Sequence, residues 1–381
     1  MTVVKRGAAQ CGETPEPRVT TPAADLAVRC RLDRMVERRD TPGLQYLHVS
    51  SDAGLFEYHA GLADVPNRRP VTERTTFNAY SVTKTLTATA ILQLAEQGRV
   101  DLDRPIAHYL GHFPGSPSPT LRQTLLHRGG FPNPNPMAWV HLAAEHASFG
   151  DAAFVREVCA AHAKLKAAPG QRTRYSNIGY LLLGAVVAKV SAQRYTDYIE
   201  SQLIAPLGLA AGETLGFSIR VPSQHARGTL ARWSAMNAVL GLLLDRERYT
   251  QGHADGWVQF RHHHVNGAAY GGLIANARGL ARYAQALLGR GATFATALRA
   301  QLLEPVPEPG GGEPQHSLGW FVGKLRGEPY LAHAGGGAGY YCELRLYPRP
   351  ARVSVLMLNR TGVRDARLLD TIDADFVAPP R

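Results

Sequence analysis

The chain has 381 residues, 45% of them apolar, and a formal net charge of +11. This length is enough for about two domains with a large buried core, and the composition excludes both a disordered protein and a collagen-like repeat. The 42 basic residues are spread over the whole chain, whereas phosphate binding requires a basic stripe. The charge therefore indicates a solvated basic surface without nucleic-acid partners.

No stretch is apolar for the roughly 20 residues that a membrane helix needs, so we expect no membrane partner. Residues 1–29 lack the apolar run of a secretory signal, which predicts a cytoplasmic protein. The four cysteines form no CxxC pair and no metal-ligand spacing, as is typical of a reducing compartment, and we expect them to have no functional role. They are Cys11, Cys30, Cys159 and Cys342.

The first hundred residues alternate between helical and strand patterns. Residues 1–24, which include several prolines and threonines, are expected to be a poorly ordered leader. Residues 25–38 carry apolar side chains at helical spacing and predict one short helix. Residues 44–49 and 55–60 are β-prone and separated by a short turn-forming segment, so they predict a hairpin. Apolar residues recur at helical spacing after Ser81, which places Ser81 at or near a helix N-terminus.

Helical patterns dominate the middle of the chain, and strand patterns return in its tail. Residues 106–255 predict a mainly helical block, which is broken by loops rich in glycine and proline. Residues 273–288 predict another helix. Three β-prone runs follow at residues 317–322, 340–347 and 353–358. Strands at both ends around a helical middle predict a sheet that is closed by the two ends of the chain.

These patterns divide the chain into two predicted domains. An α/β domain is formed by residues 25–100 together with residues 265–375. A mainly helical domain, residues 101–264, is inserted between these two segments. We expect the active site in the cleft between the two domains, because ligand sites commonly lie at domain boundaries.

The sharpest motif is the segment Ser81-Val82-Thr83-Lys84. Residues three apart on a helix share a face, so the Lys84 amine is expected beside the Ser81 hydroxyl. A buried lysine that has lost its charge can act as the base that activates a serine nucleophile. An isolated S-x-x-K match is typical of a solvated helix face, so the motif needs further support.

Further support comes from Tyr175-Ser176-Asn177, which directly precedes an apolar helical pattern. A tyrosine phenol becomes a useful base when a nearby cation lowers its pKa, and Lys84 is a candidate for that cation. The amide of Asn177 is suited to orienting Lys84 or a substrate carbonyl. On its own, the same triplet would be typical of a helix cap.

A third motif consists of His333-Ala334-Gly335-Gly336-Gly337, ahead of the strand predicted at residues 340–347. A glycine-rich strand edge lets a substrate backbone approach closely, and one of its N–H groups can complete an oxyanion hole. A simple glycine turn is the alternative. The chain has no GK[ST] phosphate loop, so nucleotide binding has no support.

The order S-x-x-K, Y-x-N, H-x-G resembles the superfamily of serine β-lactamases and penicillin-binding proteins, and within it the branch of class C β-lactamases and family VIII esterases. Similar connecting phrases, such as GRVDLDRPIAHYL and GGLIANARGLA, extend the resemblance over residues 44–362. The resemblance implies a β-lactamase/transpeptidase-like α/β fold, in which helices flank an antiparallel sheet and a mainly helical domain is inserted. It implies no cofactor and no metal.

The resemblance also implies a role for each motif residue. Ser81 becomes the nucleophile, and Lys84 and Tyr175 share the proton transfers. The N–H groups of Ser81 and Gly336 form the oxyanion hole. Substrate-binding residues at the cleft are Asn177, His333, Gly335 and Gly336.

The implied function is that of a serine hydrolase that acts on small esters or amides through an acyl-enzyme. His333 stands where the β-lactamases usually have lysine, and a mostly neutral histidine suits a substrate carboxylate less well, which favours esters over β-lactams. An acyltransferase or thioesterase with the same Ser-Lys-Tyr site remains an alternative. A non-catalytic binding module on the same fold is a second one.

The run His262-His263-His264 is the remaining candidate for a metal site. Three consecutive side chains point in different directions, so one strong metal site from them alone is not expected. The sequence favours a surface loop at this position.

Overall fold

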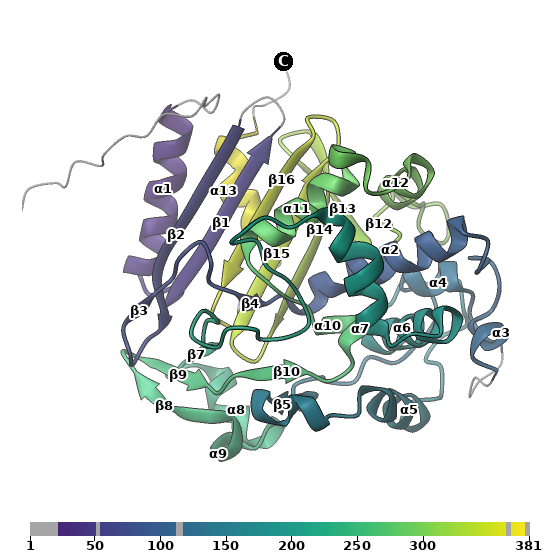
Figure 1. Cartoon of the computed structure of the whole chain (residues 1–381), viewed down its shortest axis with the longest axis horizontal. Coiled ribbons are helices and arrows are strands. Elements are labelled where there is room, and N and C mark those ends of the chain that lie inside the picture. Colours follow the sequence, from purple (N-terminus) through teal and green to yellow (C-terminus); the bar gives the residue numbers. More distant parts are fainter. Residues whose placement is uncertain (1–21, 51–53, 112–116, 363–366, 378–381) are drawn as a thin grey trace, which may run out of the picture.

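The computed structural model describes residues 22–50, 54–111, 117–362 and 367–377. In this part of the chain, the central feature is an eight-stranded antiparallel sheet with the strand order β12-β13-β14-β15-β16-β1-β2-β3 (Figure 1). The strands are β1 (Gly43–Ser50), β2 (Gly54–Asp64), β3 (Arg69–Pro70), β12 (His316–Ser317), β13 (Trp320–Leu325), β14 (Glu328–Gly337), β15 (Tyr340–Tyr347) and β16 (Arg352–Leu358).

The two ends of the chain meet in the middle of this sheet. Strand β1 pairs with β2 on one side and with β16 on the other, where Leu44 lies opposite Leu358. Most side chains of β1, β15 and β16 are buried, because both faces of the sheet are covered. The predicted closure of the sheet by the chain ends is therefore confirmed.

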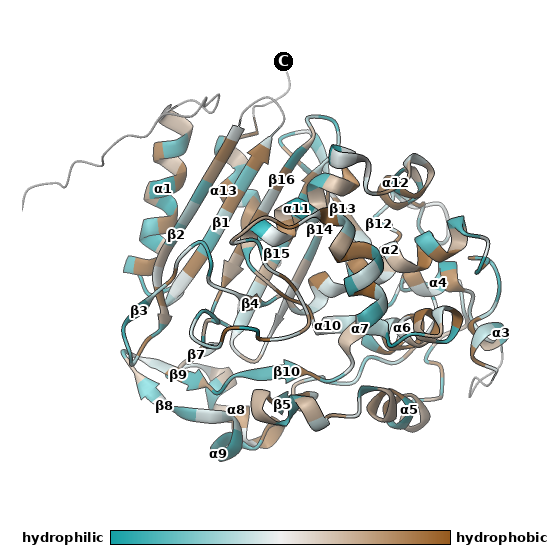
Figure 2. Ribbon diagram, viewed as in Figure 1, coloured by the Kyte–Doolittle hydropathy of each residue, from teal (hydrophilic) through white to brown (hydrophobic). Residues whose placement is uncertain are grey.

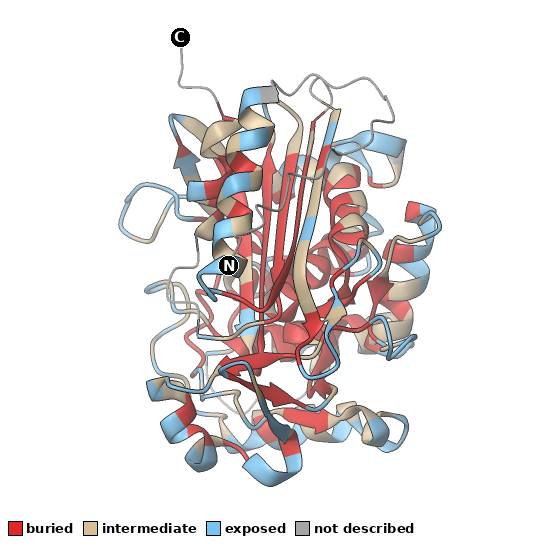
Figure 3. Cartoon of the chain, turned by 90° about the vertical axis from the view of Figure 1, so that its left-hand side faces the viewer, coloured by how far each residue is buried: buried red, intermediate tan, exposed pale blue. Residues whose placement is uncertain are grey.

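Helices cover both faces of the sheet (Figure 3). On one face, α1 (Pro22–Glu37) and α13 (Leu368–Ile372) pack on an apolar cluster that includes Val28, Leu32 and Phe56. Helix α1 alternates polar and apolar residues, as expected for a helix with one face in water (Figure 2). On the other face, α11 (Ala277–Leu287) contacts β1 and β16.

The helical side of the molecule is built around α2 (Thr83–Glu96) and α6 (Asn177–Ser191), which pack on each other and on α10 (Ala268–Gly271). The 3-10 turn η1 (Tyr80–Val82) leads into α2 and contacts β14 and β15. The other helices are α3 (Ile106–Leu110), α4 (Leu121–Leu125), α5 (Asp151–Ala161), α7 (Tyr195–Tyr198), α8 (Ala235–Leu243), α9 (Arg246–Tyr249) and α12 (Thr296–Leu303).

Segment 101–264, expected to be mainly helical, contains short strands as well as helices. Three small sheets pair β10 with β5, β11 with β4 and β6, and β9 with β7 and β8. Their strands are β4 (Phe77–Asn78), β5 (Val140–Leu142), β6 (Leu215–Gly216), β7 (Thr229–Ala231), β8 (Thr250–Ala254), β9 (Trp257–Phe260), β10 (His263–Val265) and β11 (Ile274–Ala275). The predicted limits of the two domains stay a prediction.

Most other predicted elements are found near their expected positions. The first helix and the hairpin correspond to α1 and to β1 with β2, and the three tail strands correspond to β13, β15 and β16. The helix predicted from residue 273 begins only at Ala277, because β11 precedes it and the side chain of Asn276 caps it by accepting a hydrogen bond from the Gly279 N–H. Residues 1–21 of the predicted leader lie outside the described residues.

The expectation of a surface loop at the histidine run is wrong. His263 and His264 belong to β10, and their side chains are only 1% and 5% exposed. Strand β10 pairs with β5, where His264 lies opposite His141, and this pairing covers the strand.

Within the described residues, no helix has the length and apolar character required to cross a membrane.

Candidate active site

Ser81 is the accessible end of an otherwise buried segment. It lies in η1, one turn before α2, and is partly exposed, whereas residues 82–90 are all buried. The sequence prediction that Ser81 lies near a helix N-terminus is confirmed. Ser81 is thus partly accessible, while the helix behind it is held rigidly by packing.

The residue before Ser81 has an unusual backbone conformation. Tyr80 has a φ of 46°, in the left-handed region that only glycine adopts without cost. Its hydroxyl donates to Nε2 of His263, 3.1 Å away, because the His263 Nδ1–H donates to the Arg261 carbonyl. A Cβ at Gly337 would lie 2.7 Å from the Tyr80 ring. The buried His263 thus helps to hold the turn that presents Ser81.

Lys84 reaches Ser81 along the face of α2. Its Nζ donates to Ser81 Oγ at 3.0 Å and to the Tyr270 carbonyl at 2.8 Å. The lysine side chain is fully buried, and this burial lowers its pKa well below the ordinary lysine value. A lysine in this environment gives up its proton readily and becomes a neutral amine with a free electron pair.

Tyr175 brings a second polar hydrogen to the same oxygen. Its hydroxyl donates to Ser81 Oγ at 2.8 Å, although 94 residues separate the two in the chain. Burial raises the pKa of Tyr175, and the hydrogen bond with Ser81 opposes this rise only in part. The sequence expectation that Lys84 lowers this pKa is therefore wrong, because loss of solvation has the larger effect. Tyr175 is held as a neutral phenol, able to donate a proton.

The second motif acts both as a helix cap and as part of the site. Ser176 caps α6 by accepting a hydrogen bond from the Gly179 N–H, and its hydroxyl donates to the Pro132 carbonyl at 2.7 Å. Asn177 follows directly, and its Oδ1 is buried without a hydrogen-bond partner among the described residues. An unpaired buried amide oxygen is costly. The role of Asn177 in substrate binding stays a prediction.

The third motif lies on β14, which the sequence pattern does not predict as a separate strand. Gly335 packs against the turn that carries Ser81, and a Cβ at Gly335 would lie only 2.5 Å from the Ser81 nitrogen. The atoms nearest to such a Cβ all belong to the backbone of this turn and cannot move aside, so only glycine fits at this position. Gly336, one residue further, is exposed at the strand edge. The strand that carries Gly336 thus packs directly against the turn that carries Ser81. The oxyanion hole formed by their N–H groups stays a prediction.

His333 faces the same region as a neutral ring. Its Nδ1–H donates to the Ala334 carbonyl at 3.0 Å, and its Nε2 has no hydrogen-bond partner among the described residues. Burial, followed by the nearby Lys84, lowers its pKa to about 3. His333 therefore offers an acceptor nitrogen, whereas a lysine at this place would offer a cation.

His127 belongs to the same group of side chains, and the sequence motifs do not single it out. Its Nδ1 accepts a hydrogen bond from the Ser176 N–H at 3.2 Å, and its ring centroid lies 4.4 Å from that of Tyr175. Burial lowers its pKa, and Lys84 contributes in the same direction. In the sequence, His127 is indicated only by its place in the phrase TLRQTLLHRGG, one of the connecting phrases that resemble the family.

No group of three or more histidine, cysteine, aspartate or glutamate side chains in the described ranges is arranged to hold a metal ion. The histidine run 262–264 is explained by burial and by the contact of His263 with Tyr80.

A family model described as Beta-lactamase matches residues 28–378, and the chain therefore belongs to the β-lactamase family. Protein flp of Staphylococcus aureus (strain N315) is 27% identical over 188 residues, which cover 46% of this chain and 36% of that protein. The chain thus spans about a third of the length of this relative.

Solved structures show the same fold. SurE superposes with a TM-score of 0.69 at 26% identity, covering 94% of this chain and 78% of that one. The D-amino acid amidase from Ochrobactrum anthropi SV3, complexed with L-phenylalanine amide, gives a TM-score of 0.74 at 20% identity and covers 93% of this chain and 98% of that one. The predicted α/β fold with an antiparallel sheet and flanking helices is confirmed by these similarities.

Proposed function

We propose that this protein is a serine hydrolase that cleaves small esters or amides through an acyl-enzyme on Ser81. The observation that carries the proposal is that both Lys84 and Tyr175 donate hydrogen bonds to Ser81 Oγ. A hydroxyl held between a potential base and a potential acid has the arrangement that nucleophilic catalysis requires.

In the acylation step, Ser81 Oγ attacks the substrate carbonyl and its proton passes to the neutral amine of Lys84. The new oxyanion accepts hydrogen bonds from the N–H groups of Ser81 and Gly336. Tyr175 then protonates the leaving alcohol or amine and recovers a proton from Lys84. Water repeats the sequence on the acyl-enzyme, releases the acid and restores the free serine.

The neutral His333 supports esters and neutral amides over β-lactams. A β-lactam carries a carboxylate that a lysine would pair with, whereas the bare Nε2 of His333 repels an anion and accepts a hydrogen bond from an O–H or N–H group. Amides enter the proposal because one structural neighbour is described as an amidase complexed with L-phenylalanine amide, and SurE is described in complex with D-Leu.

The test is a substrate panel: p-nitrophenyl esters of rising chain length, the D- and L-forms of phenylalanine amide, and a chromogenic cephalosporin. We expect at least one ester or amide to be cleaved with a higher kcat/KM than the cephalosporin, and Ser81→Ala to remove that activity. An added alcohol or amine acceptor distinguishes hydrolysis from acyl transfer by the product formed. A cephalosporin cleaved faster than every ester and amide would overturn the proposed substrate class.

A further inference from the structure

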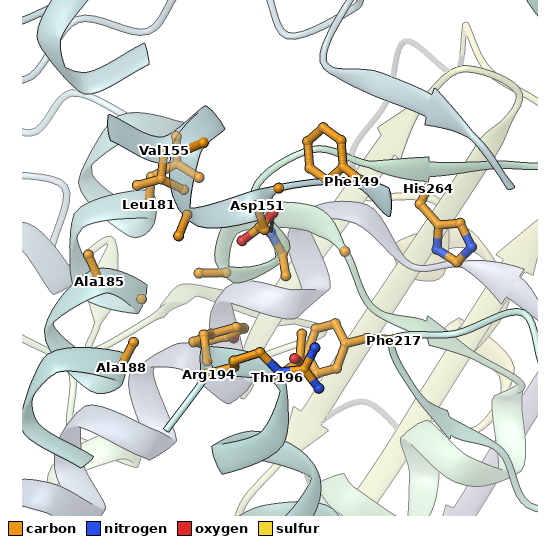
Figure 4. A pocket seen from close by; sticks show the side chains of 18 of the residues that line it. Phe149, Asp151, Val155, Leu181, Ala185, Ala188, Arg194, Thr196, Phe217 and His264 are labelled. Atoms are coloured by element: carbon orange, nitrogen blue, oxygen red, sulfur yellow. Dashed lines mark hydrogen bonds between the residues drawn. The ribbon is translucent and has the colours of Figure 1, made fainter. Parts of the chain in front are cut away.

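A cavity of about 860 Å³ lies behind the candidate active site, between α5, α6 and α7 (Figure 4). This volume is in the range of pockets for small organic molecules. None of the predicted site residues lines it. One wall is α10, which contributes Ala268 and Ala269 to the cavity, while the carbonyl of Tyr270 in the same helix accepts a hydrogen bond from Lys84. The cavity is therefore a separate space that shares a wall with the catalytic lysine.

Small side chains create the hollow. Ala185 and Ala188 face it from α6, next to Leu181, and Val155 faces it from α5 (Figure 4). The ring of Phe217 lies on the other side (Figure 4). These residues provide an apolar surface that suits a hydrocarbon chain or an aromatic ring.

Asp151 at this cavity forms no ion pair among the described residues. Its Oδ1 accepts hydrogen bonds from the backbone N–H groups of Gly267 and Ala268, at 2.7 and 3.1 Å. Glu200 accepts a hydrogen bond from the N–H of Phe217 and interacts electrostatically with Arg194. Burial raises the pKa of Asp151, as expected for a carboxylate removed from water without a counter-ion. By contrast, Asp197, which also lines the cavity, forms an ion pair with Arg194 at 2.7 Å.

The histidines beside Asp151 also leave an acceptor free. His141 Nδ1–H donates to Asn266 Oδ1 at 2.6 Å, so its Nε2 accepts a hydrogen bond from His146 Nδ1–H at 3.0 Å. The neutral His146 then has only an acceptor, its Nε2, left for another molecule. Burial lowers the pKa of both rings, which keeps them neutral.

The cations that line the cavity do not pair with Asp151. Arg156 and Lys189 have exposed side chains, and Arg194 forms an ion pair with Asp197 and also interacts with Glu200. The interior thus combines an apolar surface with an unpaired carboxylate, which is the chemistry that binds an organic ammonium ion.

We propose that this cavity is a binding site for a small primary amine with an apolar body. Its ammonium group donates to Asp151, and its apolar part lies on Leu181, Ala185 and Ala188 of α6. The proposal does not depend on catalysis at Ser81, because neither the cavity nor its acceptors include that residue.

Calorimetry with the Ser81→Ala protein tests the site without interference from acylation. The probes are 2-phenylethylamine, its neutral counterpart 2-phenylethanol and the acid 3-phenylpropionate. We expect the amine to bind at one site, at least about tenfold more tightly than either of the other two, which is the size of one charged hydrogen bond. Equal or tighter binding of the acid or the alcohol would overturn the proposal.

Variants locate the binding site. Asp151→Asn keeps an oxygen for the N–H groups of Gly267 and Ala268 but removes the charge, and we expect it to weaken amine binding by about tenfold or more. The matched control is Asp197→Asn, whose carboxylate is already paired, and which should leave the affinity unchanged. Unchanged affinity in Asp151→Asn would place the amine elsewhere.

A steric variant provides an independent check. Ala188→Phe fills the apolar part of the cavity and should abolish amine binding, and Ala185→Phe serves if the first variant does not fold, as judged by its thermal unfolding. Binding that persists in a folded filling variant would contradict the proposed position.

Discussion

Buried polar groups differ between the two regions that α10 separates, the Ser81 site on one side and the cavity on the other. On the Ser81 side, burial lowers the pKa of Lys84 and of His333 and raises that of Tyr175, so that burial favours the neutral form of each group. On the cavity side, Asp151 forms no ion pair among the residues described, and its Oδ1 accepts only backbone hydrogen bonds.

This difference separates two ways in which a protein uses buried polar groups. A neutral base and a neutral acid can exchange a proton with Ser81 without creating a large charge in a dry site, so the cleft is ready for chemistry. An unpaired carboxylate performs no such exchange, and its burial becomes favourable when a cation binds. We infer that the Ser81 site is arranged for reaction and the cavity for recognition.

The largest expected effect comes from removing the nucleophile proposed for the Ser81 site. Ser81→Ala should lower turnover of the preferred ester by about 10⁴-fold or more and abolish covalent labelling by a fluorophosphonate. Mass spectrometry of the labelled wild-type protein should place the adduct on the peptide that contains Ser81. Labelling retained in Ser81→Ala, with the adduct on another serine, would show that the nucleophile lies elsewhere.

Tyr175→Phe keeps the ring but removes the hydroxyl, and acylation should fall by about 100-fold, the usual contribution of a positioned acid or base. Lys84→Ala should be at least as damaging. Because both groups act on one oxygen, the double variant should be little worse than the poorer single variant. Single-turnover acylation rates of the three variants measure this, and losses that simply multiply would contradict a shared proton path.

Replacing the neutral acceptor at position 333 by a cation tests whether the charge at this position selects the substrate. His333→Lys should raise the kcat/KM for the cephalosporin relative to that for the best ester by about tenfold, because the ammonium group pairs with the substrate carboxylate. His333→Gln is the matched control, since it is polar and uncharged and should leave the ratio near its wild-type value. A ratio unchanged in His333→Lys would show that position 333 does not select the substrate.

The last expected effect concerns stability and no longer activity, and it applies to both sides of α10. Burial lowers the pKa of His263 to about 4 and those of His264 and His333 to about 3, whereas an unfolded histidine has a pKa of about 6.5. Between these values the unfolded chain binds more protons than the folded one, so stability falls as the pH is lowered below about 6.5. Each histidine contributes at most about 1.4 kcal/mol per pH unit.

Thermal unfolding measured between pH 7.5 and pH 5 tests this sign. The Tm should fall toward pH 5, and the fall should be shallower in His264→Phe, which removes one titrating ring but keeps an aromatic surface against His146. A Tm that stays constant or rises on acidification would contradict the neutral, buried state of these histidines.

The sequence predicts the catalytic group well because its signals are local or ordered along the chain. Helical spacing alone places Lys84 beside Ser81, and the order of the three motifs supplies Tyr175 and His333. The structure confirms that Ser81, Lys84 and Tyr175 meet at one oxygen. Their catalytic roles remain a proposal.

Other features depend on contacts that no spacing reveals. The left-handed conformation of Tyr80 and its bond to His263 join residues 183 apart. The histidine run looks polar enough for a surface loop, but pairing of β10 with β5 buries it. The pKa of Tyr175 depends on how much water is excluded around it, which the motif alone does not indicate. Such tertiary effects explain why the sequence leaves out His127 and the amine cavity.

The pairing of β1 with β16 has a consequence for synthesis of the protein on the ribosome. Leu44 emerges early, but its partner Leu358 lies far along the chain and emerges much later. Until then, one edge of β1, whose side chains are almost all buried in the finished sheet, stays open to other chains. Products truncated before β16 are therefore expected to aggregate, and a slow folding step should follow synthesis of β16, because the contacts between β1 and β16 are so distant in sequence.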